Sequence, residues 1–364
     1  MKISGFTLVR NGERFDYPYL ESLRSLLPGV DELVINVGDG DDDTLARVRE
    51  FGAREGQGKV VIFESRWPLD NPEKKKGGLI LSEQTNLALD RCTGDWCVYL
   101  QADEVLHEAD WARLREAISA ADSDPAIDGI LFDYLHFYGS FDVVQISRSA
   151  YRREVRAIRR ASGARSIGDA QSFRKGGGVK LAVSRPSVRI FHYGWVRPPE
   201  KMREKTFHMD QLYHGGKTET MDSAGSPSAT SGPFAGSKTG EDAASAVNTQ
   251  PRTGDNYRYK RFWGLRRYDG PHPAVMAERI RSRGWHWNLA TSPFEWTLAD
   301  GKKIVLDLFE RATGIRLFEY RSYRLAESRR SNTSPANTAR TASDSAGANT
   351  LPANEKNPPP RAAR

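Results

Sequence analysis

The stretch that decides the fold is residues 95–104, which read DWCVYLQADE. Its apolar run, 98–100, is short, uninterrupted and bounded by polar residues, as is typical of a parallel-sheet strand covered on both faces. The run ends in Asp103 and Glu104. A carboxylate at the C-terminal end of such a strand lies where open α/β sheets bind ligands. Asp103 is therefore a candidate to hold a divalent cation against a phosphate-bearing substrate; the alternative is that both acids only begin the next helix.

Strand-like and helix-like segments alternate on the N-terminal side of this stretch. The strand-like segments are 3–9, 33–37, 60–63 and 96–100, and the helix-like segments between them are 15–27, 44–51 and 79–89. Such alternation predicts a doubly wound, Rossmann-like α/β fold, with a mainly parallel sheet and helices on both faces. We place this α/β region at 1–135.

The rest of the chain is less regular. Residues 136–217 include a strand-like segment at 188–191 and a helix-like segment at 198–213. Residues 218–254 are rich in Ser, Thr, Gly, Ala and Pro and are expected to be a disordered insertion, because they cannot bury enough apolar surface to offset ordering entropy. Residues 255–326 regain aromatic side chains and predict a folded helical extension. Residues 327–364 are polar and of low complexity, which predicts a disordered tail.

Composition limits the class of protein. The net charge of +7 and the pI near 9.3 suggest a polyanionic partner, but the excess is diffuse, so we expect no nucleic-acid partner. The two cysteines, Cys92 and Cys97, predict reduced thiols in a cytoplasmic protein. Residues 1–6 are too short for a signal peptide, and no run is long enough to cross a membrane. Any membrane contact is expected to be peripheral, at the inner face.

The acidic loop 38–44 has two interpretations. Asp39, Asp41, Asp43 and Glu50 match the first, third, fifth and twelfth positions of an EF-hand loop. The sixth position should be glycine but is Thr44, and the preceding segment is strand-like rather than helical, so calcium binding is rejected. Asp39 instead stands at a strand end, where its carboxylate could accept hydrogen bonds from a base NH or ribose hydroxyls.

The glycine pattern excludes two common nucleotide-binding motifs. Residues 175–180, KGGGVK, lack the spacing of a P-loop and do not lie between a strand and a helix. No G-x-G-x-x-G follows the first strand-like segment, so a dinucleotide-binding motif is absent too. The glycines are expected to form a loop.

Two further residues carry side chains that could take part in metal binding or acid–base catalysis. His192 follows the strand-like segment 188–191, and its imidazole could join Asp103 on a cation; the alternative is a hydrogen-bonded structural histidine. Asp169 could serve as general base towards a hydroxyl nucleophile; the alternative is a helix N-cap.

Read together, these motifs resemble the family-2 glycosyltransferases, which have the GT-A fold. The matching pieces are the strand and Asn-containing loop 7–12, the acidic turn 37–44, the helical pattern 84–89, the tripeptide 94–96 and the Asp-x-Asp-like site 101–104. Residues 168–171 and 192–197 look like a bacterial branch of that family. One departure is that Gln101 stands where the family has the first acid.

The resemblance implies a hexosyl or related transferase that inverts the anomeric centre. It implies a nucleotide-diphosphate sugar donor, Mg²⁺ or Mn²⁺ as cofactor, and an acceptor hydroxyl on an unknown glycan, lipid-linked or protein acceptor. Region 1–135 would bind the donor, and 136–217 would complete the catalytic and acceptor part of the same domain. The expected substrate-binding residues are Asn11, Asp39, Asn86, Gln101 and Arg156, the expected metal ligands are Asp103 and His192, and the expected base is Asp169.

Two other functions stay open at this stage. A nucleotidyltransferase could use a similar α/β sheet, although it would usually show a glycine-rich basic loop after the first strand, which 10–14 only faintly resembles. A nucleic-acid-binding protein is suggested by the pI and by the Arg-rich segment 148–165. The alternative for that segment is a strand with basic faces.

Overall fold

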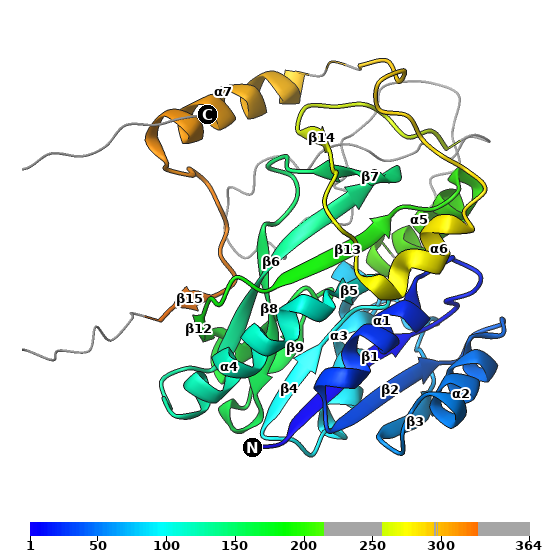
Figure 1. Cartoon of the computed structure of the whole chain (residues 1–364), viewed down its shortest axis with the longest axis vertical. Coiled ribbons are helices and arrows are strands. Elements are labelled where there is room, and N and C mark those ends of the chain that lie inside the picture. The colour runs from blue at the N-terminus through cyan, green and yellow to red at the C-terminus, as the bar shows by residue number, and fades with distance from the viewer. Residues whose placement is uncertain (215–256, 295, 297, 327–364) are drawn as a thin grey trace, which may run out of the picture. The chain divides into compact units, whose positions relative to one another are not determined.

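The computed structural model describes residues 1–214, 257–294, 296 and 298–326 (Figure 1). The predicted insertion at 218–254 and the predicted tail at 327–364 lie outside the described residues. Met1–Ala326 forms one compact unit, so the strands of the N-terminal and later segments belong to a common structure.

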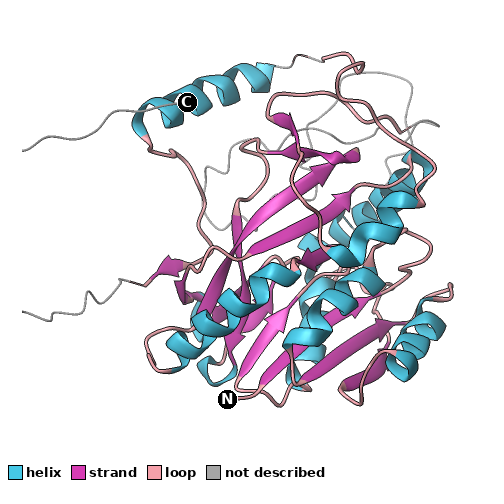
Figure 2. Cartoon of the chain, in the orientation of Figure 1, coloured by secondary structure: helices cyan, strands magenta, loops and turns pink. Residues whose placement is uncertain are grey.

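The first four strands form a parallel part of a 12-stranded sheet. Their spatial order is β3 (Val60–Ser65), β2 (Glu32–Gly38), β1 (Ile3–Val9) and β4 (Trp96–Tyr99), and all three neighbouring pairs are parallel. The helices between them are α1 (Tyr19–Leu26), α2 (Thr44–Arg54) and α3 (Leu79–Asp90). The predicted α/β fold with helices on both faces is confirmed, as Figure 2 shows.

One predicted helix boundary is wrong. The helix expected over 15–27 begins only at Tyr19. Asn11 and Asp16 adopt left-handed backbone conformations, with φ of 52° and 51°, so the chain turns before the helix begins. This turn brings residues 10–17 over the carboxyl end of β1.

Beyond β4 the sheet becomes mixed. β8 (Arg153–Arg159) lies antiparallel to β4, and β6 (Gly129–Tyr138) lies antiparallel to β8. The remaining strands of this sheet are β5 (Glu104–Leu106), β7 (Ser140–Gln145), β12 (Ala182–Ser184), β13 (Arg189–Trp195), β14 (Leu265–Arg267) and β15 (Arg324–Leu325). β13 runs between β5 and β6, and its register sets His192 opposite both Glu104 and His136. Three polar residues from distant parts of the sequence therefore meet inside the sheet.

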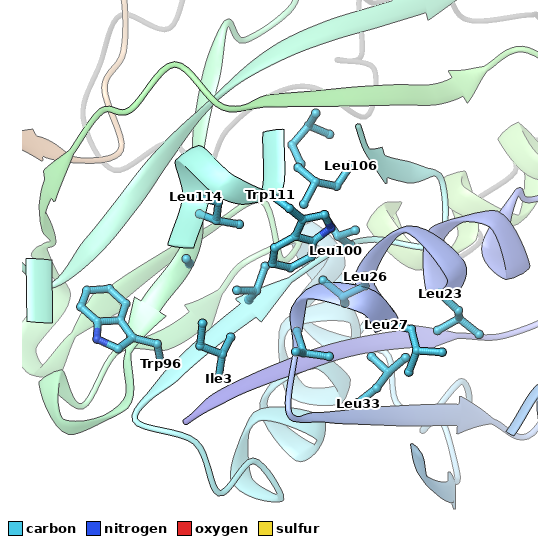
Figure 3. Close-up of a cluster of buried hydrophobic side chains, with 14 of the residues drawn as sticks. Ile3, Leu23, Leu26, Leu27, Leu33, Trp96, Leu100, Leu106, Trp111 and Leu114 are labelled. Atoms are coloured by element: carbon cyan, nitrogen blue, oxygen red, sulfur yellow. The ribbon is translucent and has the colours of Figure 1, made fainter. Parts of the chain in front are cut away.

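Alternate side chains of β1, β2 and β4 enter two separate cores, as the period of two in a strand requires. One core joins Ile3, Leu33 and Trp96 to α1 and to α4 (Trp111–Asp122), and Figure 3 shows this cluster. The other core includes Phe6 and Tyr99. It is covered by α3 and by a small antiparallel sheet of β9 (Arg165–Ile167), β10 (Ser172–Lys175) and β11 (Val179–Lys180).

The remaining helical elements are three α-helices in the later part of the unit and several short 3₁₀ turns along it. They are α5 (Pro199–His214), α6 (Ala277–Arg281), α7 (Leu298–Thr313) and the short 3₁₀ turns Leu27–Gly29, Lys76–Gly78, Glu108–Asp110, Arg160–Ser162, Gly176–Gly178 and Ala274–Met276. No helix formed by the described residues is both long and apolar enough to span a bilayer. Cys92 and Cys97 are buried free thiols, as the sequence predicts.

Candidate active site

A cavity opens at the carboxyl ends of β1 and β4, where an open α/β sheet binds its ligands. Its empty space is about 1150 Å³, including the open mouth. Its lining includes the end of β1 and the turn that follows it, the 101–103 turn after β4, the 169–171 turn, β13 and α5. Asp103, Asp169 and His192, which the sequence singles out separately, all line it.

Asp103 is buried and lies beside a lysine. The Nζ atom of Lys205, on α5, lies 3.1 Å from Asp103 Oδ2 and donates a 2.8 Å hydrogen bond to the carbonyl oxygen of Gly194. Burial alone would raise the pKa of Asp103, but the Lys205 ammonium, helped by Arg197, lowers it below its usual range. Burial lowers the pKa of Lys205 to about 8. At pH 7 the two groups therefore form a carboxylate–ammonium pair.

Burial keeps the His192 ring neutral, and a chain of hydrogen bonds fixes which of its nitrogens carries the proton. Burial lowers the pKa of His136 to about 3 and that of His192 to about 4, so both rings are neutral at pH 7. His136 Nε2 lies 2.7 Å from the carbonyl oxygen of Tyr151, which can only accept, so this nitrogen carries the proton. His136 Nδ1 then accepts from His192 Nδ1 at 2.9 Å. The remaining nitrogen, His192 Nε2, keeps a lone pair 3.7 Å from Asp103 Oδ1.

Gly194 leaves open the space between these groups. A Cβ atom at this position would lie 2.5 Å from His192 Nε2 and 2.9 Å from Asp103 Oδ2. No other amino acid fits without displacing one of them. The imidazole lone pair, the carboxylate and the Gly194 carbonyl oxygen thus surround a position that favours a cation.

Asp169 lies in the turn before β10 and lines the cavity. Its carboxylate accepts hydrogen bonds from the Tyr213 hydroxyl at 3.1 Å and from the Gln171 backbone N–H at 3.3 Å. Burial raises the pKa of Asp169, while these hydrogen bonds act in the opposite direction. A raised pKa makes a carboxylate a stronger base, as proton removal from a hydroxyl requires.

The Tyr213→Phe variant tests this arrangement through pH. The tyrosine hydroxyl stabilises the charged form of Asp169, so its removal raises the pKa of Asp169 further. A base acts when unprotonated, so kcat/KM falls as pH drops through that pKa. We expect the acidic limb of the pH profile of kcat/KM to move to higher pH in Tyr213→Phe. The control Tyr268→Phe, whose hydroxyl contacts Pro271, should leave the limb in place; an unmoved limb in Tyr213→Phe would contradict the assignment.

The acidic loop after β2 braces the rim of the cavity. Asn11 is buried and holds the loop through both polar atoms of its side-chain amide. Its Oδ1 accepts from the Asp41 N–H at 3.1 Å, and its Nδ2 donates to Asp41 Oδ1 at 2.7 Å. Asp39 is exposed and accepts from the Trp67 N–H at 2.8 Å, and its carbonyl oxygen accepts from Arg10 Nε. Trp67 and Arg10 line the cavity. Asn11 and Asp39 thus lie next to residues that line the cavity without lining it themselves, and their contact with a donor stays a prediction.

Two predicted substrate-binding residues are placed elsewhere. Asn86 forms a pair of 2.9 Å hydrogen bonds with the backbone of Ser166 and does not line the cavity, so it anchors β9 to α3. Arg156 is fully buried and forms two 2.9 Å hydrogen bonds with Glu104. The prediction that Arg156 contacts the donor is wrong, because its guanidinium faces the sheet interior; it supports the site by donating to the Gln171 carbonyl oxygen at 2.8 Å.

Gln101 remains in the site. It lines the cavity, and its amide lies 3.5 Å from the Ala170 carbonyl oxygen, which links the two turns that carry Asp103 and Asp169. A neutral amide at this position supplies no charge for a cation. Its contact with a donor stays a prediction.

Six of the seven arginines in the segment 148–165 form ion pairs with carboxylates. The pairs are Arg148–Asp307, Arg152–Glu310, Arg153–Asp133, Arg156–Glu104, Arg159–Asp122 and Arg165–Asp90. Arginines already paired with carboxylates present little net charge to a polyanion. The strand alternative for this segment is confirmed by β8, and the sequence signal for nucleic-acid binding loses its main support.

Several residues of the site stand out only in the folded chain. Tyr17 lies under two cations, with Lys205 Nζ 5.0 Å and the Arg197 guanidinium 4.7 Å from its ring centre. Arg197 is fully buried, and its Nε and Nη2 atoms have no hydrogen-bond partner. From the sequence, Lys205 is one of three basic residues, with Arg156 and Arg159, that could stabilise a leaving diphosphate, and no local pattern chooses among them.

A divalent cation does not fit beside Lys205. No group of three or more His, Cys, Asp or Glu side chains suited to a metal occurs among the residues that the structure describes. A metal bonded to Asp103 would lie close to the ammonium, and two unit charges 4 Å apart repel by about 4 kcal/mol at an effective dielectric constant of about 20. The expected ligands Asp103 and His192 are brought together, but the position between them already faces a cation.

Comparisons with known proteins return likenesses among solved structures alone. No family model matches the chain, and no curated protein matches it. The chain is similar to S. aureus TarS 1–349 in complex with UDP-GlcNAc, at 14% identity over 58% of this chain and 65% of that chain, with a TM-score of 0.33. It is also similar to glucosyl-3-phosphoglycerate synthase from Mycobacterium tuberculosis in complex with Mn²⁺, UDP and phosphoglyceric acid, at 15% identity over 58% and 75% of the chains, with a TM-score of 0.33.

A third likeness is to GalNAc-T7 with UDP, GalNAc and Mn²⁺, at 12% identity over 54% of this chain and 44% of that chain, with a TM-score of 0.33. The match to the longer TarS chain covers 39% of its length. Likenesses of this size bear on neither the substrate nor the residues of this chain.

Proposed function

We propose that this chain transfers a sugar from a nucleoside-diphosphate sugar to an acceptor hydroxyl. The observation that supports this best is that one cavity is lined both by the Asp103–Lys205 pair at the end of β4 and, separately, by Asp169, whose pKa is raised. The ammonium of the Asp103–Lys205 pair can stabilise a diphosphate that gains negative charge. The Asp169 carboxylate can take the proton that an acceptor hydroxyl loses.

The reaction would be a single displacement. The acceptor oxygen attacks C1 of the sugar while Asp169 takes its proton, and the bond between C1 and the diphosphate oxygen breaks with its electron pair going to the diphosphate. Attack on the face opposite the leaving group inverts the anomeric centre and needs no covalent intermediate. The cavity contributes most by holding both reactants in line.

In the proposed complex the donor would lie in the cavity in one defined direction. The nucleoside would lie against the rim built by Asn11, Asp39 and Trp67, and the diphosphate would point to Asp103 and Lys205. Asn11, Asp39 and Asp103 belong to the segments on which the resemblance to family-2 glycosyltransferases is based. The alternative source of positive charge is Mg²⁺ or Mn²⁺ held by Asp103 and His192, which would require Lys205 to leave its position beside Asp103.

Thermal unfolding with a panel of nucleoside diphosphates and their sugars tests the donor class. A ligand that binds only the native state, at a free concentration of 100 times its Kd, raises the free energy of unfolding by about 2.7 kcal/mol. We expect nucleoside-diphosphate sugars to raise the melting temperature of the chain. In Gly194→Ala the new Cβ would lie 2.5 Å from His192 Nε2, so we expect turnover to fall by about 100-fold.

The matched control is Gly176→Ala, because a Cβ there meets nothing within 4 Å and turnover should not change. Equal turnover in Gly194→Ala and Gly176→Ala would contradict the site. Stabilisation by nucleoside triphosphates with sugar phosphates, and none by diphosphate sugars, would favour a nucleotidyltransferase.

A further inference from the structure

Three electron-pair donors face one position at the end of β4, and a lysine reaches it. They are the Asp103 carboxylate, the Gly194 carbonyl oxygen and the His192 Nε2 lone pair. We infer that Lys205 itself supplies the positive charge that stabilises the departing diphosphate, at the position where a divalent cation is expected. This inference rests on the proposed function and names the group that performs its central electrostatic step.

The structure holds the Lys205 side chain at this position from several directions. Its Nζ lies 3.1 Å from Asp103 Oδ2, 2.8 Å from the Gly194 carbonyl oxygen and 5.0 Å from the ring centre of Tyr17. The side chain is 14% exposed, and it lines the cavity. An ammonium group has three donors. Two are used by Asp103 and Gly194, which leaves the third for a phosphate oxygen.

The neighbouring acids do not complete a metal site. Gln101 carries an amide where the resemblance expects the first acid. Glu104, the next acid after Asp103, is fully buried and its two carboxylate oxygens are bonded to Arg156. Magnesium usually needs one or two carboxylates and several waters besides the phosphates. The single carboxylate of Asp103 already has a cation, so the charge balance of the position is met without a metal.

The chemistry of the step balances without a proton passing through Lys205. The bond between C1 and the diphosphate oxygen breaks, the electron pair stays on that oxygen, and Lys205 remains an ammonium that donates a hydrogen bond to it. The acceptor proton goes to Asp169. A fixed charge that contacts the leaving oxygen more strongly as its charge grows lowers the barrier. Asp103 acts as a positioning residue that keeps the ammonium in place.

The first test uses the wild-type chain. Mn²⁺ binding is measured by electron paramagnetic resonance for the wild type and for Asp103→Asn, without any nucleotide. We expect the same Mn²⁺ binding in both, because Lys205 already neutralises Asp103. We also expect turnover of the donor to be unchanged by EDTA. Stoichiometric Mn²⁺ binding that Asp103→Asn removes, or turnover that EDTA abolishes and Mn²⁺ restores, would overturn the inference.

The second test removes the ammonium. We expect Lys205→Ala to lower kcat by about 100-fold, the size typical of a lost stabilising donor in a transition state. Lys201→Ala is the matched control: Lys201 lies one turn earlier on α5 and donates to the Arg14 carbonyl oxygen, away from Asp103. Lys205→Arg keeps the charge and should retain more activity than Lys205→Ala. A Lys205→Ala variant with the kcat of Lys201→Ala would overturn the inference.

The vacated position gives a readout that does not depend on turnover. In Lys205→Ala, Asp103 and His192 Nε2 lose the competing cation, so we expect this variant to gain a Mn²⁺ site that Asp103→Asn in the same background removes. If the wild type turns over no diphosphate sugar with or without metal, the proposed function fails, while Mn²⁺ binding still decides whether Lys205 or a metal occupies the position beside Asp103. If the wild type turns over the donor only with metal, the proposed function stands and the inference fails.

Discussion

Replacing Asp169 with Asn is expected to slow sugar transfer by about 100- to 10,000-fold, the range over which general bases contribute. The amide has nearly the same shape as the carboxylate but cannot accept a proton at this step. The Tyr213 hydroxyl can still donate to the side chain, so the turn should keep its position. Donor binding should therefore be retained while the chemical step is lost.

Single-turnover rates and donor-induced thermal shifts separate these two effects. Asp269→Asn, at an exposed aspartate, is the control and should transfer at the wild-type rate. An Asp169→Asn variant that transfers at more than about a tenth of the wild-type rate would remove Asp169 from the role of base, because general bases contribute at least about 100-fold. A variant that no longer binds the donor would show instead that Asp169 contacts it.

Replacing Glu104 with Gln is expected to lower the free energy of unfolding by about 3–5 kcal/mol, because the change leaves Arg156 charged and buried without its partner. Both side chains are 0% exposed, and Arg156 Nε and Nη2 each lie 2.9 Å from a Glu104 oxygen. The Tyr134 hydroxyl donates to the same carboxylate at 2.8 Å. Three strands, β5, β6 and β8, meet at this pair, so its loss weakens the sheet behind the cavity.

Denaturation in urea measures this effect. Asp90→Asn breaks the exposed pair with Arg165, whose side chain is 45% exposed, and should cost at most about 1 kcal/mol. The double variant Glu104→Gln with Arg156→Met removes both charges and should recover part of the loss. Equal stability of Glu104→Gln and Asp90→Asn would show that the buried pair contributes no more than an exposed one.

The parts of the fold that depend on local pattern could be predicted from the sequence. The strand-like segments 3–9, 33–37 and 96–100 coincide with β1, β2 and β4 to within a residue or two, because their apolar runs are short and bounded by polar turns. The position of Asp103 beside a cavity follows from the same pattern, since it stands just beyond the end of a parallel strand.

The parts that depend on long-range contacts could not be predicted. Lys205 reaches Asp103 across 102 residues of sequence, and no local pattern distinguishes it from its neighbour Lys201. His136 fixes the tautomer of His192 only because β6 and β13 pair in register. Arg156 looks like a surface base in the sequence but is drawn inside by Glu104, since burial is decided by the partner rather than by the residue type.

Identifying the bond that the chain breaks in a nucleoside-diphosphate sugar shows whether the chain transfers the sugar. Phosphorus-31 magnetic resonance of the products, with the donor that stabilises the chain best, distinguishes the two possible cleavages. We expect the wild type to release a nucleoside diphosphate by cleavage of the bond between C1 and the diphosphate oxygen. Asp169→Asn should release much less of this product. Release of a nucleoside monophosphate and a sugar phosphate, or an intact donor under all conditions, would contradict it.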